Sequence, residues 1–275
     1  MLVVKLVGNL ILVYILVVAA AYFMQRSMQY YPDQSPVANP QLYHVSEFKV
    51  IEVKTQDGLT NIAWYAKPKK EDYPVIVLFH GNAGHIGDRS SKASLLTNAG
   101  YGVLLAEYRG YGGNGGSPTE EGLYEDGRAV MKWLQDNGVR ASKVVLYGES
   151  LGSGIAMQLS REYGVSGVVL ESPFTSLADA GKYHYPWLPV HMLIKDKYDN
   201  LKKIKKIDVP LLIIHGKNDQ VIPFEQSEKL FKTAVTIKIF ARKESGRHEN
   251  LYDHGAFNDV DKFIKDYIIM EDDLW

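Results

Sequence analysis

The sequence predicts an α/β fold built on a mostly parallel, eight-stranded sheet with helices on both faces. From Val75 onward, short apolar runs alternate with segments of helical periodicity, which is typical of parallel strands joined by right-handed crossovers. One such run, residues 143–147, leads through a serine between glycines into a segment where Ile155 and Leu159 lie one helical turn apart. The length of 275 residues, with 46% hydrophobic residues, suits one large domain of this class and a short extension.

The chain begins with an apolar segment that predicts a membrane helix. Residues 6–24 carry no charged side chain. At about 1.5 Å per residue they would extend about 28 Å, close to the thickness of a bilayer core. Two interpretations stay open: a transmembrane anchor over residues 1–25, or a cleaved signal peptide with Ala19-Ala20-Ala21 as its cleavage-like site. The anchor is favoured by an aromatic cluster of the kind found at membrane interfaces, Tyr22, Phe23, Tyr30 and Tyr31.

The flanking charges give a weak orientation signal. Lys5 lies on one side of the apolar segment and Arg26 on the other. We expect a single-pass protein with its amino terminus inside, which places the following domain on the non-cytoplasmic side, in a periplasm or a lumen. Residues 26–45 contain three prolines between Pro32 and Pro40. They predict a polar linker that holds the domain, residues 46–275, a short distance from the membrane.

Eight strands are expected in the domain. The first two form an antiparallel hairpin with Asp57-Gly58 at its turn, and the other six are parallel. The predicted strands are residues 48–54, 61–66, 75–79, 103–106, 143–147, 167–170, 211–214 and 236–240.

A helix is predicted after the fourth strand. Ser117-Pro118-Thr119-Glu120 has the form of a capping box, with Ser117 as the N-cap and proline at the first helical position. The residues that share one face of this helix are Leu123, Gly127, Val130 and Leu134.

The segment Gly148-Glu149-Ser150-Leu151-Gly152 predicts a nucleophilic serine. A G-x-S-x-G sequence between a strand and a helix holds the serine on a sharp, strained turn with its hydroxyl exposed. Side chains two residues before and after the serine would collide with the strand and the helix, which explains the glycines. The alternative is a glycine-rich turn without chemistry, which is common in α/β proteins.

Two later residues complete a Ser, Asp, His order along the chain. Asp219 follows the apolar run 211–214, and His248 lies in the loop after the run 236–240. Both therefore fall at the carboxyl end of a strand, where α/β sheets place their sites. Taken singly, Asp219 also fits a turn-forming aspartate and His248 a solvated loop histidine. Together with Ser150 they predict a catalytic triad of nucleophile, acid and base.

The oxyanion hole is predicted at two backbone N–H groups. One belongs to Leu151, the residue after the nucleophile. The other lies in His80-Gly81-Asn82-Ala83-Gly84, the loop after the third strand, and we assign it to Asn82 with Ala83 as the alternative. His80 is interpreted as a residue that braces this loop rather than as a second base or a metal ligand.

The sequence resembles the α/β-hydrolase superfamily over about residues 48–268. The resemblance rests on the elbow at Ser150, the His80–Gly84 loop, Glu171-Ser172-Pro173-Phe174, and His215-Gly216 followed by Asp219 and Ile222-Pro223. Tyr108-Arg109-Gly110-Tyr111-Gly112 is similar to the membrane-associated serine hydrolases that include fungal bud-emergence proteins, bacterial relatives and protein-depalmitoylating members. By position, the resemblance implies the same roles for Ser150, Asp219 and His248, and its anchored members favour an anchor here.

This resemblance has two departures. Glu107 stands where that group often has Asp, and Arg247 stands where a small residue usually precedes the histidine. Neither removes a catalytic atom. Arg247 could narrow the mouth of the site or favour anionic substrates.

A small cap is expected as an insertion at about residues 175–208. Its aromatic residues Tyr183, Tyr185 and Trp187 fit two interpretations equally: they line an acyl-binding groove, or they cover the edge of the sheet. The lysines at 202, 203, 205 and 206 predict a solvated helix face, with contact to anionic lipid as the alternative. Asp196 and Asp199 rank far below Asp219 as the triad acid because neither follows a strand.

Composition excludes several other functions. The chain has no Cys, hence no disulfide, thiol nucleophile or cysteine-based zinc site. A net charge of −1 without a basic cluster argues against a nucleic-acid partner. No metal or other cofactor is expected, and the sequence does not define an oligomeric state.

The predicted function is hydrolysis of a carboxylic ester or thioester through an acyl-enzyme. The expected partners are a small-molecule or lipid-like acyl substrate and a membrane. Two alternatives remain: a serine peptidase of the same fold, and a non-catalytic, membrane-anchored binding protein.

Overall fold

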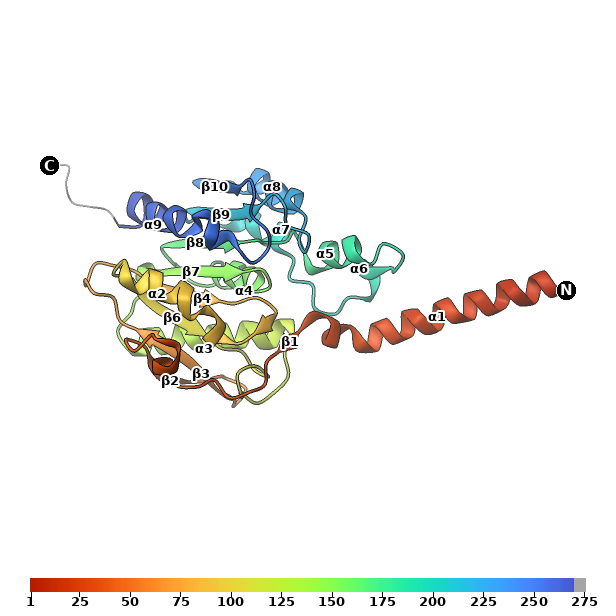
Figure 1. Ribbon diagram of the computed structural model, residues 1–275, viewed down its shortest axis with the longest axis horizontal. Coiled ribbons are helices and arrows are strands. Elements are labelled where there is room, and N and C mark those ends of the chain that lie inside the picture. The colour runs from red at the N-terminus through yellow and green to blue at the C-terminus, as the bar shows by residue number, and fades with distance from the viewer. Residues whose placement is uncertain (270–275) are drawn as a thin grey trace.

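A twisted sheet of eight strands forms the centre of the fold in the computed structural model, which describes residues 1–269 (Figure 1). Residues 270–275, the end of the predicted domain 46–275, lie outside the described residues. The strand order is β10-β9-β8-β7-β4-β6-β3-β2. The strands are β2 (Lys49–Lys54), β3 (Thr60–Ala66), β4 (Val75–Phe79), β6 (Gly102–Ala106), β7 (Val144–Glu149), β8 (Gly167–Glu171), β9 (Leu211–Gly216) and β10 (Lys238–Lys243).

The sheet confirms the predicted class. β2 pairs with β3 and β3 with β6 in antiparallel fashion, and all other neighbours are parallel. The last strand differs most from its predicted bounds of 236–240. It runs from Lys238 to Lys243 because β9 extends to Gly216 and pairs with it over that whole length.

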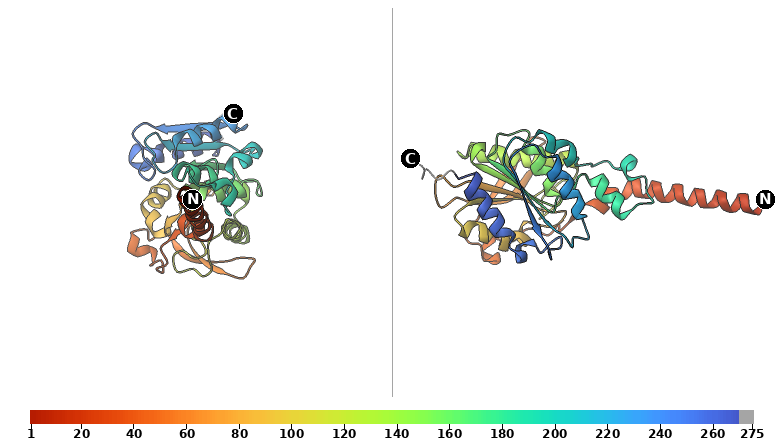
Figure 2. Two further views of the ribbon diagram at one scale, coloured as in Figure 1. Left: turned by 90° about the vertical axis from the view of Figure 1, so that its right-hand side faces the viewer. Right: turned by 90° about the horizontal axis from the view of Figure 1, so that it is seen from above.

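Alternate residues of the central strands face two separate cores, as the pleat of a strand requires. Val77 of β4 belongs to the core under α3 (Glu120–Asp136), α4 (Gly152–Leu159) and α8 (Phe224–Thr233). Its neighbour Leu78 belongs to the core under α2 (Ser90–Asn98) and α9 (Ala256–Tyr267). Figure 2 shows these helices on opposite faces of the sheet. Short 3₁₀ helices complete the connections: Pro40–Tyr43, Ile86–Arg89, Ala141–Lys143, Ile204–Lys206 and Leu251–His254.

The start of α3 corrects the predicted capping box. The helix begins at Glu120, and the N-cap is Thr119, whose Oγ1 accepts a hydrogen bond from the Gly122 N–H at 3.0 Å. The Glu120 N–H donates to Asp196 Oδ1 at 3.1 Å. Two of the free N–H groups at the helix start are therefore satisfied without Ser117.

Helix α1 (Leu2–Gln29) begins at the amino terminus and projects from the sheet body (Figures 1 and 2). Its most apolar stretch is long enough to cross a membrane and is not buried inside the protein.

Residues 26–45, predicted to be a spacer, instead lie against the domain. β1 (Tyr31–Pro32) pairs with β5 (Ala83–Gly84), and the Gly112 N–H donates to the Asp33 carbonyl at 2.7 Å. The domain is therefore held directly at the end of α1.

The insertion between β8 and β9 forms the cap. It contains α5 (Leu177–His184), α6 (Val190–Leu193) and α7 (Asn200–Lys203). The first two lie beside the carboxyl-terminal half of α1, outside the sheet body (Figure 1).

Candidate active site

Ser150 occupies a strained turn between β7 and α4. Its φ of +49° lies in the left-handed region, which non-glycine residues rarely adopt. The Ser150 N–H donates to the Glu171 carbonyl at 2.8 Å, which ties the turn to β8. A Cβ at Gly148 would lie 2.6 Å from the Gly152 oxygen, and a Cβ at Gly152 would lie 2.0 Å from the Phe79 oxygen. Only glycine fits at either position, which accounts for the G-x-S-x-G sequence.

The fold brings Ser150, His248 and Asp219 together. In the sequence, His248 lies 98 residues after Ser150 and 29 residues after Asp219. His248 Nε2 lies 3.0 Å from Ser150 Oγ, and His248 Nδ1 lies 2.7 Å from Asp219 Oδ2. A carboxylate only accepts hydrogen bonds, so Nδ1 carries the proton of the neutral ring. The lone pair of Nε2 therefore faces the serine hydroxyl, as a general base requires.

Asp219 is held by four donors. Its Oδ1 accepts the N–H groups of Val221 at 2.8 Å and Ile222 at 2.9 Å. Its Oδ2 accepts from His248 and also lies 2.9 Å from His215 Nε2. That Nε2 faces only acceptors, Asp219 and the Ile222 carbonyl at 3.0 Å, so it carries a proton. The three donors besides His248 fix the orientation of the carboxylate.

His215 is a site residue whose role the sequence did not reveal. Its ring is fully buried, and Nδ1 lies 2.5 Å from Ser227 Oγ. The only sequence signal is its position at the carboxyl end of β9, four residues before Asp219.

The electrostatics of the pair favour charge separation. Burial opposes ionisation of Asp219, but hydrogen bonds from His215 and His248 outweigh it and lower the pKa of the carboxyl well below its usual value. For His248, burial favours the neutral ring, but the hydrogen bond and the charge of Asp219 raise the imidazole pKa above 6.5. An imidazolium at His248 is therefore stabilised when it accepts a proton.

The two predicted oxyanion donors line one cavity with Ser150. The Asn82 carbonyl accepts from the Tyr31 N–H and the Tyr111 hydroxyl, both at 2.9 Å, and Asn82 Nδ2 donates to the Gln29 carbonyl at 3.1 Å. Among residues 1–269, neither the Asn82 nor the Leu151 N–H donates to another main-chain group. Ala83, the alternative, lies in β5 and does not line the cavity.

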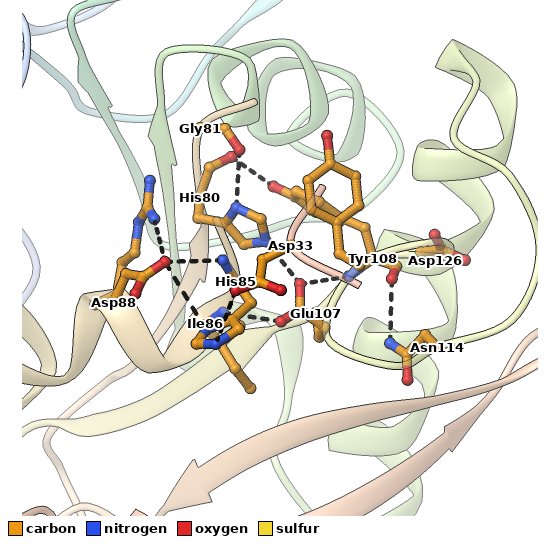
Figure 3. A network of polar contacts seen from close by, with 12 residues as sticks. Asp33, His80, Gly81, His85, Ile86, Asp88, Glu107, Tyr108, Asn114 and Asp126 are labelled. Atoms are coloured by element: carbon orange, nitrogen blue, oxygen red, sulfur yellow. Dashed lines mark hydrogen bonds and ion pairs between the residues drawn. The ribbon is translucent and has the colours of Figure 1, made fainter. Parts of the chain in front are cut away.

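His80 braces the loop that carries Asn82. Its Nε2 lies 2.8 Å from Glu107 Oε1 and its Nδ1 lies 2.8 Å from the Gly81 oxygen (Figure 3). Glu107 Oε2 accepts the Ile86 N–H at 2.8 Å, and the Tyr108 hydroxyl donates to the His80 carbonyl at 2.8 Å. Glu107 thus connects both ends of the loop, with a carboxylate one methylene longer than aspartate.

The sequence also did not reveal a partly buried network of charged side chains beside Ser150. Glu149 binds Arg89 Nη2 at 2.7 Å and Lys92 Nζ at 2.9 Å, and Lys92 binds Glu171 at 2.6 Å. Burial disfavours the Glu149 carboxylate, but the two cations lower its pKa well below 4.5. The network joins α2 to the ends of β7 and β8 on either side of Ser150.

The cavity at Ser150 has a volume of about 350 Å³ and mostly apolar walls. Cap residues such as Leu177, Leu188 and Leu193 form one wall. Ala21, Gln25 and Met28 of α1 form another. None of the lining residues within the described chain is Asp, Glu, Lys or Arg.

Several other candidates lie away from the triad. Asp196 pairs with Arg26 at 2.9 Å, and Asp199 caps α7 through the Lys202 N–H at 3.0 Å. Lys203 is buried against Tyr124, so the lysine run is not one solvated face.

Arg247 and the question of a metal site concern the surroundings of the triad residues. Arg247 is exposed and does not line the cavity. Within residues 1–269, no group of three or more His, Cys, Asp or Glu is arranged to hold a metal ion.

Comparison with known proteins finds a matching family and several relatives. The family described as serine aminopeptidase, S33, matches residues 70–198. An uncharacterized protein of Mycobacterium tuberculosis is 37% identical over 224 residues, which cover 81% of this chain and 79% of that protein. The lysophosphatidylserine lipase ABHD12 of Xenopus tropicalis is 34% identical over 195 residues, which cover 64% of this chain and only 50% of that protein.

Among solved structures, the esterase Pf2001 of Pyrococcus furiosus superposes with a TM-score of 0.71 at 20% identity. The match covers 87% of this chain and 99% of the esterase. At this identity the likeness concerns the fold.

Proposed function

Since this chain belongs to the α/β-hydrolase family of serine hydrolases, we propose that it cleaves carboxylic ester or thioester bonds of acyl substrates. Ser150 is the nucleophile, His248 the general base and Asp219 the acid that orients it. The observation that carries the proposal is the hydrogen-bonded series from Ser150 Oγ through His248, at 3.0 Å, to Asp219, at 2.7 Å.

The reaction proceeds in two half-reactions. Ser150 Oγ attacks the acyl carbonyl carbon while its proton passes to His248 Nε2, and the Asn82 and Leu151 N–H groups stabilise the oxyanion. The bond to the leaving oxygen or sulfur then breaks, and His248 returns the proton to the leaving group. A water molecule attacks the acyl-enzyme in the same way and releases the carboxylic acid and free Ser150.

The cavity favours an acyl chain over a peptide. Leu177, Leu188 and Leu193 offer apolar contact, and an ester needs no charged partner there. An aminopeptidase substrate carries a free ammonium group, which needs a carboxylate or a similar acceptor beside the site. Among the described residues the cavity has no Asp or Glu in its lining. The lipase activity in the name of the ABHD12 relative supports a lipid ester as the substrate class for this chain.

The proposal includes a single-pass membrane anchor with the domain on the non-cytoplasmic side. The long apolar helix α1 supports the anchor, and Tyr22 and Arg26 near its end support an interface there. The intact mass of protein from membranes tests it: an uncleaved amino terminus supports the anchor, and a chain that begins near Ala21 contradicts it. Protease accessibility of the domain in sealed vesicles tests the orientation.

Turnover of p-nitrophenyl esters of graded chain length tests the activity. We expect hydrolysis by the wild type and its loss in Ser150→Ala, with Ser91→Ala as the control because Ser91 is an exposed serine of α2. Aminoacyl p-nitroanilides test the peptidase alternative in the same assay. Turnover of the anilides but not of the esters would contradict the proposal, as would ester turnover that persists in Ser150→Ala.

A further inference from the structure

Helix α1 is bound to the cap along about half of its length. Near its end, Arg26 pairs with Asp196 at 2.9 Å. Gln25 donates to the Leu193 carbonyl at 3.2 Å and accepts the Lys195 N–H at 2.7 Å. Far along α1 toward the amino terminus, the Tyr14 hydroxyl donates to the Trp187 carbonyl at 3.0 Å. The cap therefore follows α1 from its domain end to the middle of its apolar stretch.

This arrangement fixes the depth of the cap relative to a bilayer. Tyr14 lies ten residues before Met24, about 15 Å along the helix axis. If Trp187 lay outside the bilayer, only residues 2–13 of α1 would remain to cross it. Those residues extend about 18 Å, whereas the hydrocarbon core is about 30 Å thick. A spanning α1 therefore requires the tip of the cap to share the bilayer with it.

The composition of the cap tip suits that environment. Residues 185–194 contain no Asp, Glu, Lys or Arg, and Lys182 and Lys195 flank them. Trp187 is 54% exposed and Met192 is 86% exposed, large apolar surfaces that water would disfavour. The Lys195 ammonium lies 4.3 Å from the ring centre of Tyr22 on α1, where both side chains suit the headgroup level.

We propose that the segment 185–194 inserts into the bilayer beside α1, and that acyl chains reach Ser150 from within the leaflet. The route is the cavity itself, whose walls come from α1 (Ala21, Gln25, Met28) and from the cap (Leu188, Val190, Leu193). α1 is then a wall of the substrate site as well as an anchor. The route rests on the proposed function, whereas the insertion does not.

Single-cysteine spin labels test the insertion, because the chain has no native Cys. Met192→Cys is labelled in the full-length protein in phosphatidylcholine vesicles. Val235→Cys, at a position 77% exposed in the loop between α8 and β10, is the aqueous control, and Leu12→Cys on α1 is the membrane reference. Collisions with dissolved oxygen and with a water-soluble nickel chelate are then measured by power saturation.

We expect the label at 192 to match that at 12, with a higher oxygen collision rate and a lower chelate collision rate than at 235. A label at 192 as accessible to the chelate as that at 235 would overturn the insertion. Shielding from both reagents would also overturn it, because a second copy or another protein would then cover the cap tip.

The route is tested by the variant Met192→Asp, at a residue that does not line the cavity. Because a carboxylate is strongly disfavoured within a bilayer, we expect hydrolysis of a long-chain ester presented in phosphatidylcholine vesicles to fall about tenfold or more. Turnover of soluble p-nitrophenyl acetate should stay at the wild-type level, and Val235→Asp should change neither. Equal turnover of the vesicle ester by wild type and Met192→Asp would overturn the route. Failure of the wild type to hydrolyse either ester would refute the proposed function and the route with it, while the labels still decide the insertion.

Discussion

His215 Nε2 lies 2.9 Å from Asp219 Oδ2, the same carboxylate oxygen that faces His248 at 2.7 Å. A buried histidine thus shares the proposed triad acid with the proposed general base. The hydrogen bond from His215 stabilises the ionised carboxylate and fixes its orientation.

Replacement of His215 should lower kcat, although His215 acts through Asp219 and does not itself contact the substrate. In His215→Phe the carboxylate loses one charge-assisted donor, and we expect kcat to fall about tenfold with KM nearly unchanged. The pH midpoint of kcat/KM should also move, because the charge of Asp219 sets the pKa of His248. His254→Gln, at an exposed histidine, is the control. A merely structural role for His215 would lower thermal stability and leave the pH profile of the folded enzyme unchanged.

The pH dependence of activity follows from His248. The base must be neutral to accept the Ser150 proton, and Asp219 raises its pKa above 6.5. The value of kcat/KM should therefore rise with pH through a midpoint above 6.5. In Asp219→Asn that midpoint should fall, because the charge that favours the imidazolium is gone, and kcat should fall by about 10⁴. A wild-type midpoint below 6.5 on a soluble p-nitrophenyl ester would contradict this account.

Asn82 tests the oxyanion hole through its backbone. Asn82→Ala keeps the N–H and loses only the side-chain hydrogen bond to the Gln29 carbonyl. We expect its kcat to stay close to that of the wild type. Asn82→Pro removes the N–H, and we expect kcat to fall about a hundredfold or more. Thermal unfolding shows whether each variant is folded. Equal kcat values for the two variants would show that the Asn82 N–H is not an oxyanion donor.

The partly buried charge network beside Ser150 should contribute to the stability of the fold. Lys92→Met removes the cation that Glu149 and the buried Glu171 share, while Glu149 keeps its pair with Arg89. We expect a loss of about 3–5 kcal/mol in the free energy of unfolding. The matched control Lys132→Met removes an exposed pair with Asp136 and should cost less than about 1 kcal/mol. Equal losses in urea unfolding would show that the network does not stabilise the fold.

The strands, and the Ser, Asp, His order of the proposed triad, could be predicted because both leave local signals in the sequence. Apolar runs such as residues 75–79 report burial on both faces. The glycines around Ser150 indicate positions where neighbouring main-chain atoms lie too close to leave room for a Cβ. His215 and Glu149 carry no such signal, because their roles depend on partners four to 60 residues away that only the fold brings close.

The region between α1 and the domain shows the same limit. Three prolines and polar residues predicted a spacer, but Tyr31 and Asp33 hydrogen-bond to the loops at Asn82 and Gly112. Composition can indicate that a segment does not form a helix. It does not indicate which loop will accept or donate the backbone hydrogen bonds of that segment. The contact between Tyr14 and Trp187, 173 residues apart, was equally outside the reach of the sequence.

The site of covalent modification by a fluorophosphonate tests directly whether Ser150 is the nucleophile. The full-length protein is reacted in vesicles, digested, and its modified peptide located by mass spectrometry. We expect one adduct, on Ser150, that is absent from Ser150→Ala and slower to form in His248→Ala. An adduct on another serine, or undiminished labelling of Ser150→Ala, would contradict it.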